Sequence, residues 1–334
     1  MTNPVRIGIV GAGRLGTFHA QKAMANPDAE LAAIYDPLEE NRDRLAERFA
    51  VPSVETLEDF LPRVDAVVIA APSTRHAELG AYFLNAGKHL LMEKPLCSRA
   101  ADAEALAALA EEKRLTLQVG HVEQFNPAWT TAGPFLRRMR EEGPMVIEAT
   151  RQSGYTFRCV DVGATLDIMI HDLELILSVL DAPIESISAR TVTEFGGFED
   201  SVWAQLEFGD GSLARLFASR VEPTPRREIT FRSAERRVRI DFAARTAETI
   251  EPSEEILRGD YAPEKIVYSE IAPAIPAFMN DRYRTRLLDH EPFDALALEM
   301  ENFVGAIQFG EEPRVPGHRA AAAVRLAEKI LKEC

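Results

Sequence analysis

The chain has 334 residues, of which 46% are hydrophobic and 27% are charged, as in an ordinary folded globular protein and unlike a disordered or fibrous one. Its 53 acidic residues outnumber its 38 lysines and arginines, and the net charge of −15 repels nucleic-acid phosphates and anionic lipid surfaces. We therefore expect no nucleic-acid or membrane partner, and the length predicts two domains.

The cysteines and the N-terminus predict the compartment. Cys97, Cys159 and Cys334 are scattered and odd in number, so they form neither a disulfide framework nor a metal-ligand pattern. No apolar run reaches the ~18 residues of a membrane span. The first residues lead into a strand without the basic region of a signal peptide. We expect a cytoplasmic protein with no bound metal.

Short apolar runs and amphipathic stretches alternate through the first third of the chain. Such runs are typical of strands buried on both faces, and their alternation with helices predicts a parallel sheet with right-handed crossovers. The predicted strands are 5–10, 30–35, 65–70, 88–92 and 115–119, and the predicted helices are 14–25, 38–50, 74–86 and 98–113, the last capped by Ser98.

The first strand ends in the sequence GAGRLG, which fits the dinucleotide-binding pattern G-x-G-x-x-G. The first glycine permits a tight turn, the second lets backbone amides approach a pyrophosphate, and the third lets the helix pack closely on the strand. The helix N-terminus adds partial positive charge for the phosphates. The predicted cofactor-binding residues of this turn are Gly11, Gly13, Arg14, Leu15 and Gly16.

Asp36 ends the second predicted strand, at the usual distance from the glycine-rich turn. A carboxylate at this place accepts hydrogen bonds from the ribose hydroxyls of NAD and repels the 2′-phosphate of NADP. Pro37 and Leu38 follow, so no adjacent cation favours NADP. The pattern predicts NAD as the cofactor; the alternative is a tight turn followed by an unrelated aspartate.

Two further segments reach the carboxyl edge of the predicted sheet, where ligands bind in such folds. One contributes Pro72, Ser73 and His76 as candidate cofactor-binding residues, although a histidine at a helix start is commonly only solvated. The sequence EKP contributes Glu93 and Lys94 to the same predicted site. Lys94 can polarise a substrate hydroxyl or carbonyl beside a nicotinamide, or it is an ordinary surface lysine.

Residues 161–181 are predicted to form an amphipathic helix with a wide apolar face. Asp167, His171, Glu174 and Ser178 form one polar stripe at helical spacing, and this stripe contains no lysine or arginine. A solvated face is one interpretation. The other is an acid–base dyad, in which Asp167 holds the imidazole of His171 and stabilises its protonated form.

The rest of the chain is predicted to be mainly sheet. Strands are predicted at 145–151, 184–193, 201–208, 212–220, 227–233 and 236–242, and helices at 294–309 and 318–332. Strands that follow one another without helices indicate an antiparallel sheet, and its open face predicts a homo-oligomer, either a homodimer or a homotetramer. The arginines of this region form a solvated strand face or an anion site: Arg226, Arg227, Arg236, Arg237 and Arg239.

These motifs together resemble the Gfo/Idh/MocA family of NAD(P)-dependent sugar oxidoreductases. GAGRLG, Asp36, EKP and the pattern Gly163-x-x-x-Asp167-x-x-x-His171 occur in the family's order over nearly the whole chain. The resemblance implies that Lys94 and His171 act on the carbinol being oxidised, with Asp167 in support. It also implies a cis peptide bond before the proline of EKP.

The family resemblance also implies a fold class and a domain organisation. We expect an α/β protein with an N-terminal Rossmann domain at 1–120. An α+β domain at 121–334, built on an open, largely antiparallel sheet, is expected to bind the substrate and to form the oligomer.

Two segments narrow the resemblance. Residues 119–128 and the version DVGATLDIMIHD resemble the UDP-N-acetylglucosamine 3-dehydrogenases, which implies oxidation of a sugar 3-hydroxyl to a ketone. Asp161 and Val162 stand where the family often has glycines, so the geometry of that loop does not transfer. The alternatives are a dehydrogenase of another cyclic polyol, such as an inositol or a free hexose, and a catalytically silent NAD-binding regulator.

The substrate-binding residues are predicted only by their proximity in sequence to the helix. Arg151, Tyr155 and Arg158 precede it and join Asp167 and His171 as candidates. His121 and Asn126 follow the last Rossmann strand. They either contribute to the expected cofactor edge or form structural hydrogen bonds.

Overall fold

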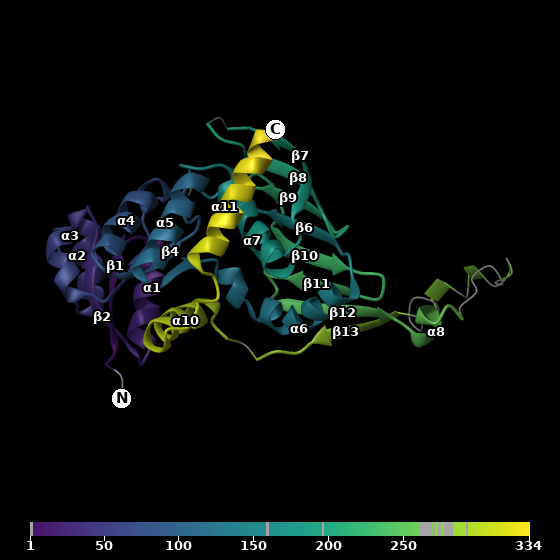
Figure 1. Cartoon of the computed structure of the whole chain (residues 1–334), viewed down its shortest axis with the longest axis horizontal. Coiled ribbons are helices and arrows are strands. Elements are labelled where there is room, and N and C mark those ends of the chain that lie inside the picture. Colours follow the sequence, from purple (N-terminus) through teal and green to yellow (C-terminus); the bar gives the residue numbers. More distant parts are fainter. Residues whose placement is uncertain are drawn as a thin grey trace.

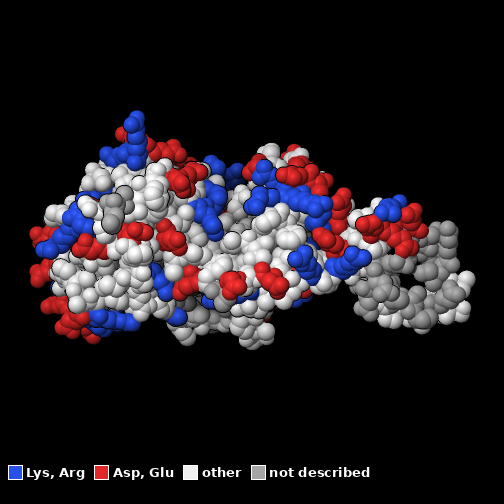
Figure 2. Space-filling model, turned by 90° about the horizontal axis from the view of Figure 1, so that it is seen from below, with Lys and Arg blue, Asp and Glu red and all other residues white. Residues whose placement is uncertain are grey.

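Figure 1 shows the computed structural model, in which a smaller and a larger sheet lie side by side with the helix α11 (Gly317–Lys332) between them. The structure describes residues 3–157, 160–195, 197–260, 267, 269, 271–272, 275–276, 283–291 and 293–334. No helix of these residues is long and apolar enough to cross a membrane. Figure 2 shows acidic and basic side chains interspersed over one face of the molecule.

The smaller sheet is the predicted parallel sheet, with the strand order β2-β1-β3-β4-β5. All four residues of its central strand are buried, as expected for a strand covered on both faces. The strands are β1 (Val5–Val10), β2 (Ala29–Tyr35), β3 (Ala66–Ile69), β4 (His89–Glu93) and β5 (Leu117–Gly120). The helices are α1 (Arg14–Ala25), α2 (Glu39–Phe49), α3 (Leu57–Phe60), α4 (His76–Asn85) and α5 (Ala100–Lys113), with short 3₁₀ turns η1 (Leu61–Arg63) and η2 (Ser73–Arg75).

The N-terminus of α5 differs from the prediction. Arg99, not Ser98, occupies the N-cap position, and its side chain makes no capping hydrogen bond. The carboxylate of Glu328 on α11 accepts from the N–H of Ala100 at 2.6 Å instead. A residue 228 positions away in sequence therefore satisfies the helix end, which local sequence could not indicate.

The larger sheet has eight strands in the order β13-β12-β11-β10-β6-β9-β8-β7. Every neighbouring pair is antiparallel except β6 and β9, which are parallel, so the predicted open, largely antiparallel sheet is confirmed. Its strands are β6 (Val146–Gln152), β7 (Ile184–Val192), β8 (Ser201–Phe208), β9 (Leu213–Ser219), β10 (Arg226–Arg232), β11 (Arg237–Asp241), β12 (Thr246–Pro252) and β13 (Tyr283–Leu288). The last two strands were not predicted, and neither was the short α8 (Glu254–Leu257) that follows β12.

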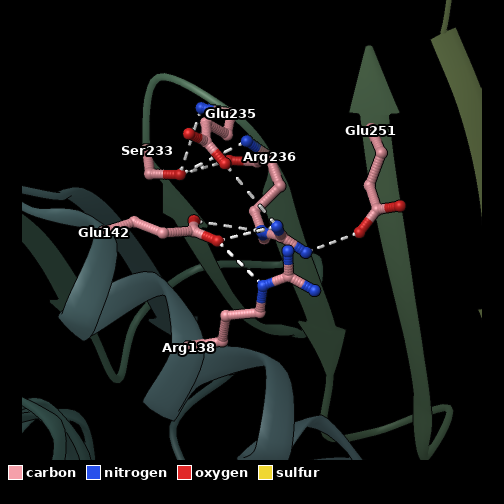
Figure 3. A network of polar contacts seen from close by, with 6 residues as sticks. All are labelled: Arg138, Glu142, Ser233, Glu235, Arg236 and Glu251. Carbon is pink, nitrogen blue, oxygen red and sulfur yellow. Dashed lines mark hydrogen bonds and ion pairs between the residues drawn. The ribbon is translucent and has the colours of Figure 1, made fainter. Parts of the chain in front are cut away.

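A further helix missing from the prediction, α6 (Pro127–Glu142), packs on this sheet. Its Trp129 stacks on Phe242 with ring centroids 6.4 Å apart. At its other end Glu142 forms a bidentate pair with the buried Arg236, which also binds Glu251 on β12 (Figure 3). These contacts fix α6 across β11 and β12. Arg236 is therefore part of a structural network rather than of the solvated face or anion site predicted for it.

The two C-terminal helices return to the Rossmann sheet. Met300, Phe303 and Val304 of α10 (Ala295–Phe309) belong to the same apolar core as β1 and α1. The helix α11 packs against both α5 and the helix α7 (Ile170–Val179) of the larger domain (Figure 1). Residues 295–332 thus hold together the parts on either side of residue 120, where β5 ends.

Candidate active site

Glycines shape the turn between β1 and α1. Gly11 has a φ of +101°, and a Cβ on it would lie 2.5 Å from the carbonyl oxygen of Ala70. A Cβ on Gly16 would lie 1.8 Å from the carbonyl oxygen of Gly11. Gly13 faces open space, and α1 has neither a side-chain cap nor an acidic residue in its first turn. The free amides of this helix N-terminus fit the pyrophosphate of NAD.

Asp36 is fixed beside this turn by two backbone donors. Its carboxylate accepts from the N–H of Ala12 at 2.7 Å and from the N–H of Leu38 at 2.9 Å. A carboxylate can accept about four hydrogen bonds, so it retains capacity for ribose hydroxyls. Arg44, which the sequence analysis did not single out, donates to the carbonyl oxygen of Ala12 at 3.2 Å and brings a cation to the same turn.

Two other candidate cofactor residues are held by protein contacts. His76 is buried, with its ring nitrogens 2.8 Å from the carbonyl oxygen of Pro95 and 3.0 Å from that of Ala71. Burial excludes the predicted solvation of His76, whose ring bridges two loops. Its contact with the cofactor stays a prediction. The hydroxyl of Ser73 donates to Asp161 at 2.6 Å and links the two domains. The remaining candidates have exposed side chains: Arg14, Leu15 and Pro72.

Glu93 supports the backbone of its neighbour. Its carboxylate pairs with Nε2 of the buried His19 at 2.7 Å and accepts from the N–H of Lys94 at 3.3 Å. Burial raises the pKa of Glu93, but the hydrogen bond from His19 and the charge of Lys94 outweigh it, and the pKa is lowered. An ionised Glu93 thus lies directly beside the cis Lys94–Pro95 peptide, which agrees with the predicted isomer.

Lys94, which follows β4 of the parallel sheet, reaches the segment before α7. Its Nζ donates to the carboxylate of Asp167 at 2.8 Å and to the carbonyl oxygen of the same residue at 2.6 Å. Both side chains are largely buried, at 15% and 17% exposure. Lys94 is therefore not an ordinary surface lysine. Its charge is fixed at the junction of the two domains.

This arrangement corrects the predicted role of Asp167. No hydrogen bond joins Asp167 to His171 among the described residues, and the Asp167 carboxylate binds Lys94 instead. The reason is local backbone geometry. Thr165–Met169 form a π-helix before α7 begins at Ile170, and the wider π turn breaks the α-helical register that the spacing of the two residues assumed.

His171 lies among positive charges. Its Nδ1 is buried and has no partner among the described residues. Burial, followed by the charges of Lys94 and Arg151, lowers the pKa of His171 well below its ordinary value of 6.5. The imidazole is therefore neutral at pH 7 and can accept a proton.

A buried ion network holds α7 beneath His171. Arg151 on β6 donates to Asp172 at 2.8 Å and to Glu123 at 2.7 Å, and all three side chains are at least 89% buried. Since both carboxylates occupy its guanidinium, Arg151 is a structural residue and not the predicted substrate contact. On the next turn Glu174, fully buried, binds Gln124 and Arg319, so the polar stripe is not a solvated face.

The N-terminus of the same helical segment is held by a residue from the loop between β7 and β8. The Glu199 carboxylate accepts from the N–H of Thr165 at 2.9 Å, as an acidic group at a helix start should. A Cβ on Gly163 would lie 2.1 Å from this carboxylate, which explains the glycine that matches the family pattern. Glu199 was missed because it is 34 residues from Thr165 and carries no motif.

The other candidates lie in different surroundings. Tyr155 packs against Phe157 and Phe195, with ring centroids 5.1 and 5.0 Å apart. Arg158 lies outside the described residues. Asn126 caps α6 by accepting from the N–H of Ala128 at 3.1 Å. This is the structural role that was one of the two predicted for it.

A dinucleotide-binding turn, a carboxylate for the ribose, and a lysine and a neutral histidine at one domain junction define a nicotinamide-dependent oxidoreductase. Residues 5–121 match the family model "Oxidoreductase family, NAD-binding Rossmann fold", and residues 138–242 match the model "GFO/IDH/MocA C-terminal domain". The chain belongs to the Gfo/Idh/MocA family of oxidoreductases, as predicted, and its cofactor is NAD.

Similarity to characterised proteins extends over the full chain. UDP-N-acetylglucosamine 3-dehydrogenase of Acidithiobacillus ferrooxidans is 32% identical over 91% of this chain and 88% of its own. Its solved structure superposes with a TM-score of 0.84, covering 99% and 98% of the two chains. Inositol 2-dehydrogenase of Rhizobium meliloti is 26% identical over 98% of this chain and 96% of its own.

Proposed function

We propose that this enzyme oxidises a secondary hydroxyl of a nucleotide sugar, namely the 3-hydroxyl of UDP-N-acetylglucosamine, to the ketone. The main support for the proposal is a contact at the carboxyl edge of the NAD-binding sheet. There Lys94 binds Asp167, in the segment that leads into His171. The similarity to UDP-N-acetylglucosamine 3-dehydrogenase favours this substrate.

The chain's own residues supply the proton chemistry. NAD, when bound, accepts the hydride from the carbinol carbon. The neutral imidazole of His171 accepts the hydroxyl proton as the carbon–hydrogen bond breaks, since an alcohol does not lose it unaided at pH 7. Lys94 directs positive charge towards the oxygen and stabilises its developing alkoxide character. Asp167 holds the ammonium group of Lys94 in that position.

A panel assay tests the proposal. Purified enzyme is incubated with NAD and, separately, UDP-N-acetylglucosamine, other UDP-sugars, inositols and free hexoses, and NADH is followed near 340 nm. We expect the highest kcat/KM with UDP-N-acetylglucosamine and a 3-keto product by NMR. Preferred turnover of an inositol, which the similarity to inositol 2-dehydrogenase keeps as the alternative substrate, would refute the proposal. Binding of NAD without turnover of any compound would favour the regulatory alternative.

A further inference from the structure

His121 occupies a fixed position directly after β5. Its N–H donates to the carbonyl oxygen of Val119 at 2.8 Å, and its carbonyl oxygen accepts from the N–H of Gln124 at 3.0 Å. These bonds close the turn into the 3₁₀ segment η3 (Val122–Phe125). The side chain is 1% exposed. The chain thus holds this imidazole rigidly at the carboxyl edge of the Rossmann sheet.

Neither ring nitrogen of His121 has a hydrogen-bond partner among the described residues. A buried polar group left without a partner is destabilising, and native structures rarely contain one without a functional reason. Burial, followed by the charges of Lys94 and Arg319, lowers the pKa of His121 to about 3. The ring is therefore neutral at pH 7 and offers one donor and one acceptor.

The ring lies beside the groups that would perform the chemistry. Its centroid is 5.9 Å from that of His171, and the two rings meet edge to face at 85°. The charge of Lys94 acts on both imidazoles. Two neutral histidines, one directly after β5 and one on α7, consequently lie beside each other and near Lys94.

We propose that His121 binds the sugar through a polar substituent on a ring carbon adjacent to the one oxidised, while His171 takes the proton of the reacting hydroxyl. This inference rests on the proposed function. Substituents on neighbouring ring carbons lie close enough to engage two neighbouring side chains. A hydroxyl or an amide both donates and accepts, as the neutral imidazole does, so the pairing satisfies the orphaned nitrogen. His121 would then select substrates that carry this substituent.

The test combines enzyme variants with altered substrates. His121→Phe keeps an aromatic ring against His171 but removes both nitrogens, and His121→Gln restores a donor and an acceptor. His290→Phe, at a half-buried histidine that follows β13 at the edge of the larger sheet, is the matched control. kcat/KM is measured with UDP-N-acetylglucosamine, its 4-deoxy analogue and the analogue that lacks the 2-acetamido group. NADH affinity and thermal unfolding are measured for every variant.

We expect His121→Phe to lower kcat/KM with the parent sugar by roughly 10- to 100-fold, at unchanged NADH affinity and folding. His121→Gln should recover part of this loss. With one of the two analogues, the kcat/KM of wild type should already be reduced. His121→Phe should lower kcat/KM little further with that analogue, because the analogue and the variant each remove the same hydrogen bond.

Several outcomes would overturn the inference. Losses of equal size on the parent sugar and on both analogues would show that His121 contacts neither substituent. A loss confined to NADH affinity would place His121 at the nicotinamide instead, and wild-type kinetics in His121→Phe would leave it a packing residue. Wild-type enzyme that turns over no sugar would remove the proposed function and this inference with it, which separates that failure from the others.

Discussion

The cofactor turn and the segment that carries His171 are held in different ways. Between β1 and α1 the backbone is shaped by close backbone approaches at Gly11 and Gly16 and by the backbone donors that bind Asp36. The helical segment is held instead by charged side chains from other elements, as Glu199 caps its start and Arg151 binds Asp172 in its middle. Substitutions of these charged side chains should therefore disturb the chemistry before they disturb cofactor binding.

The largest predicted effect lowers turnover, which depends on the segment with His171, and leaves cofactor binding at the other region unchanged. We expect His171→Ala to lower kcat by roughly 10²–10⁴-fold, the usual loss for a general base, at unchanged NADH affinity. The acid limb of the kcat/KM profile of wild type should lie below pH 6.5, because the pKa of His171 is lowered. His318→Ala, at an exposed histidine, is the control. Turnover near the wild-type rate in His171→Ala would mean that another group is the base.

The buried network should matter for stability more than any surface pair. Arg151→Met leaves Glu123 and Asp172 buried without their cation, which should lower the free energy of unfolding by about 3–5 kcal/mol. Arg226→Met removes an exposed pair with Glu228 and should cost at most about 1 kcal/mol. Urea unfolding measures both. Equal losses in the two variants would contradict the importance of the network.

An experiment can distinguish the ion pair of Asp167 with Lys94 from the Asp167–His171 dyad that the sequence spacing predicted. Asp167→Asn weakens the hold on Lys94 and should lower kcat by roughly 10- to 100-fold, the value of a hydrogen bond to a charged group. The acid limb assigned to His171 should not move. Asp181→Asn, at an exposed aspartate beyond α7, is the control. An acid limb displaced by a full pH unit would restore the Asp167–His171 dyad.

The cofactor turn should respond to a change at Asp36. Asp36→Asn keeps an acceptor for Ala12 and removes the charge, so the preference for NAD over NADP should narrow by roughly tenfold. Glu39→Gln, in the first turn of α2, is the charge-matched control. The affinities are measured by titration of the reduced cofactors. Wild-type enzyme that binds NADPH more tightly than NADH would contradict the assignment of Asp36, and Arg44 would be the residue to replace next.

The smallest effect concerns stability in acid. The pKa of His121 is lowered from 6.5 to about 3 by burial and by the positive charges of Lys94 and Arg319 that face it beside His171. The unfolded state binds the proton first, so stability should fall as pH falls below 6.5, by about 1 kcal/mol between pH 6.5 and 5.5. Urea unfolding of His121→Phe should show a smaller loss than wild type over this range. Parallel curves would exclude a contribution from His121.

Much of the fold could be predicted because its signals are local. The strands of the Rossmann sheet are apolar runs buried on both faces, and the glycine-rich turn carries its own short motif. The helix α6 was missed because its start follows a loop-like sequence and Pro134 interrupts its pattern. Its position depends on Arg236, nearly a hundred residues later, which no window of sequence contains.

The sequence by itself determined which groups were available: the cofactor turn, Asp36, Lys94 and His171, in an order that identifies the family. Tertiary structure decided how they pair. At the π turn Thr165–Met169 the Asp167 carboxylate binds Lys94, and the ring of His121 lies beside His171 with both nitrogens buried and without a partner among the described residues. Periodicity describes an ideal helix, whereas the energy of a buried charge or an unpaired nitrogen depends on neighbours that only the folded chain brings together.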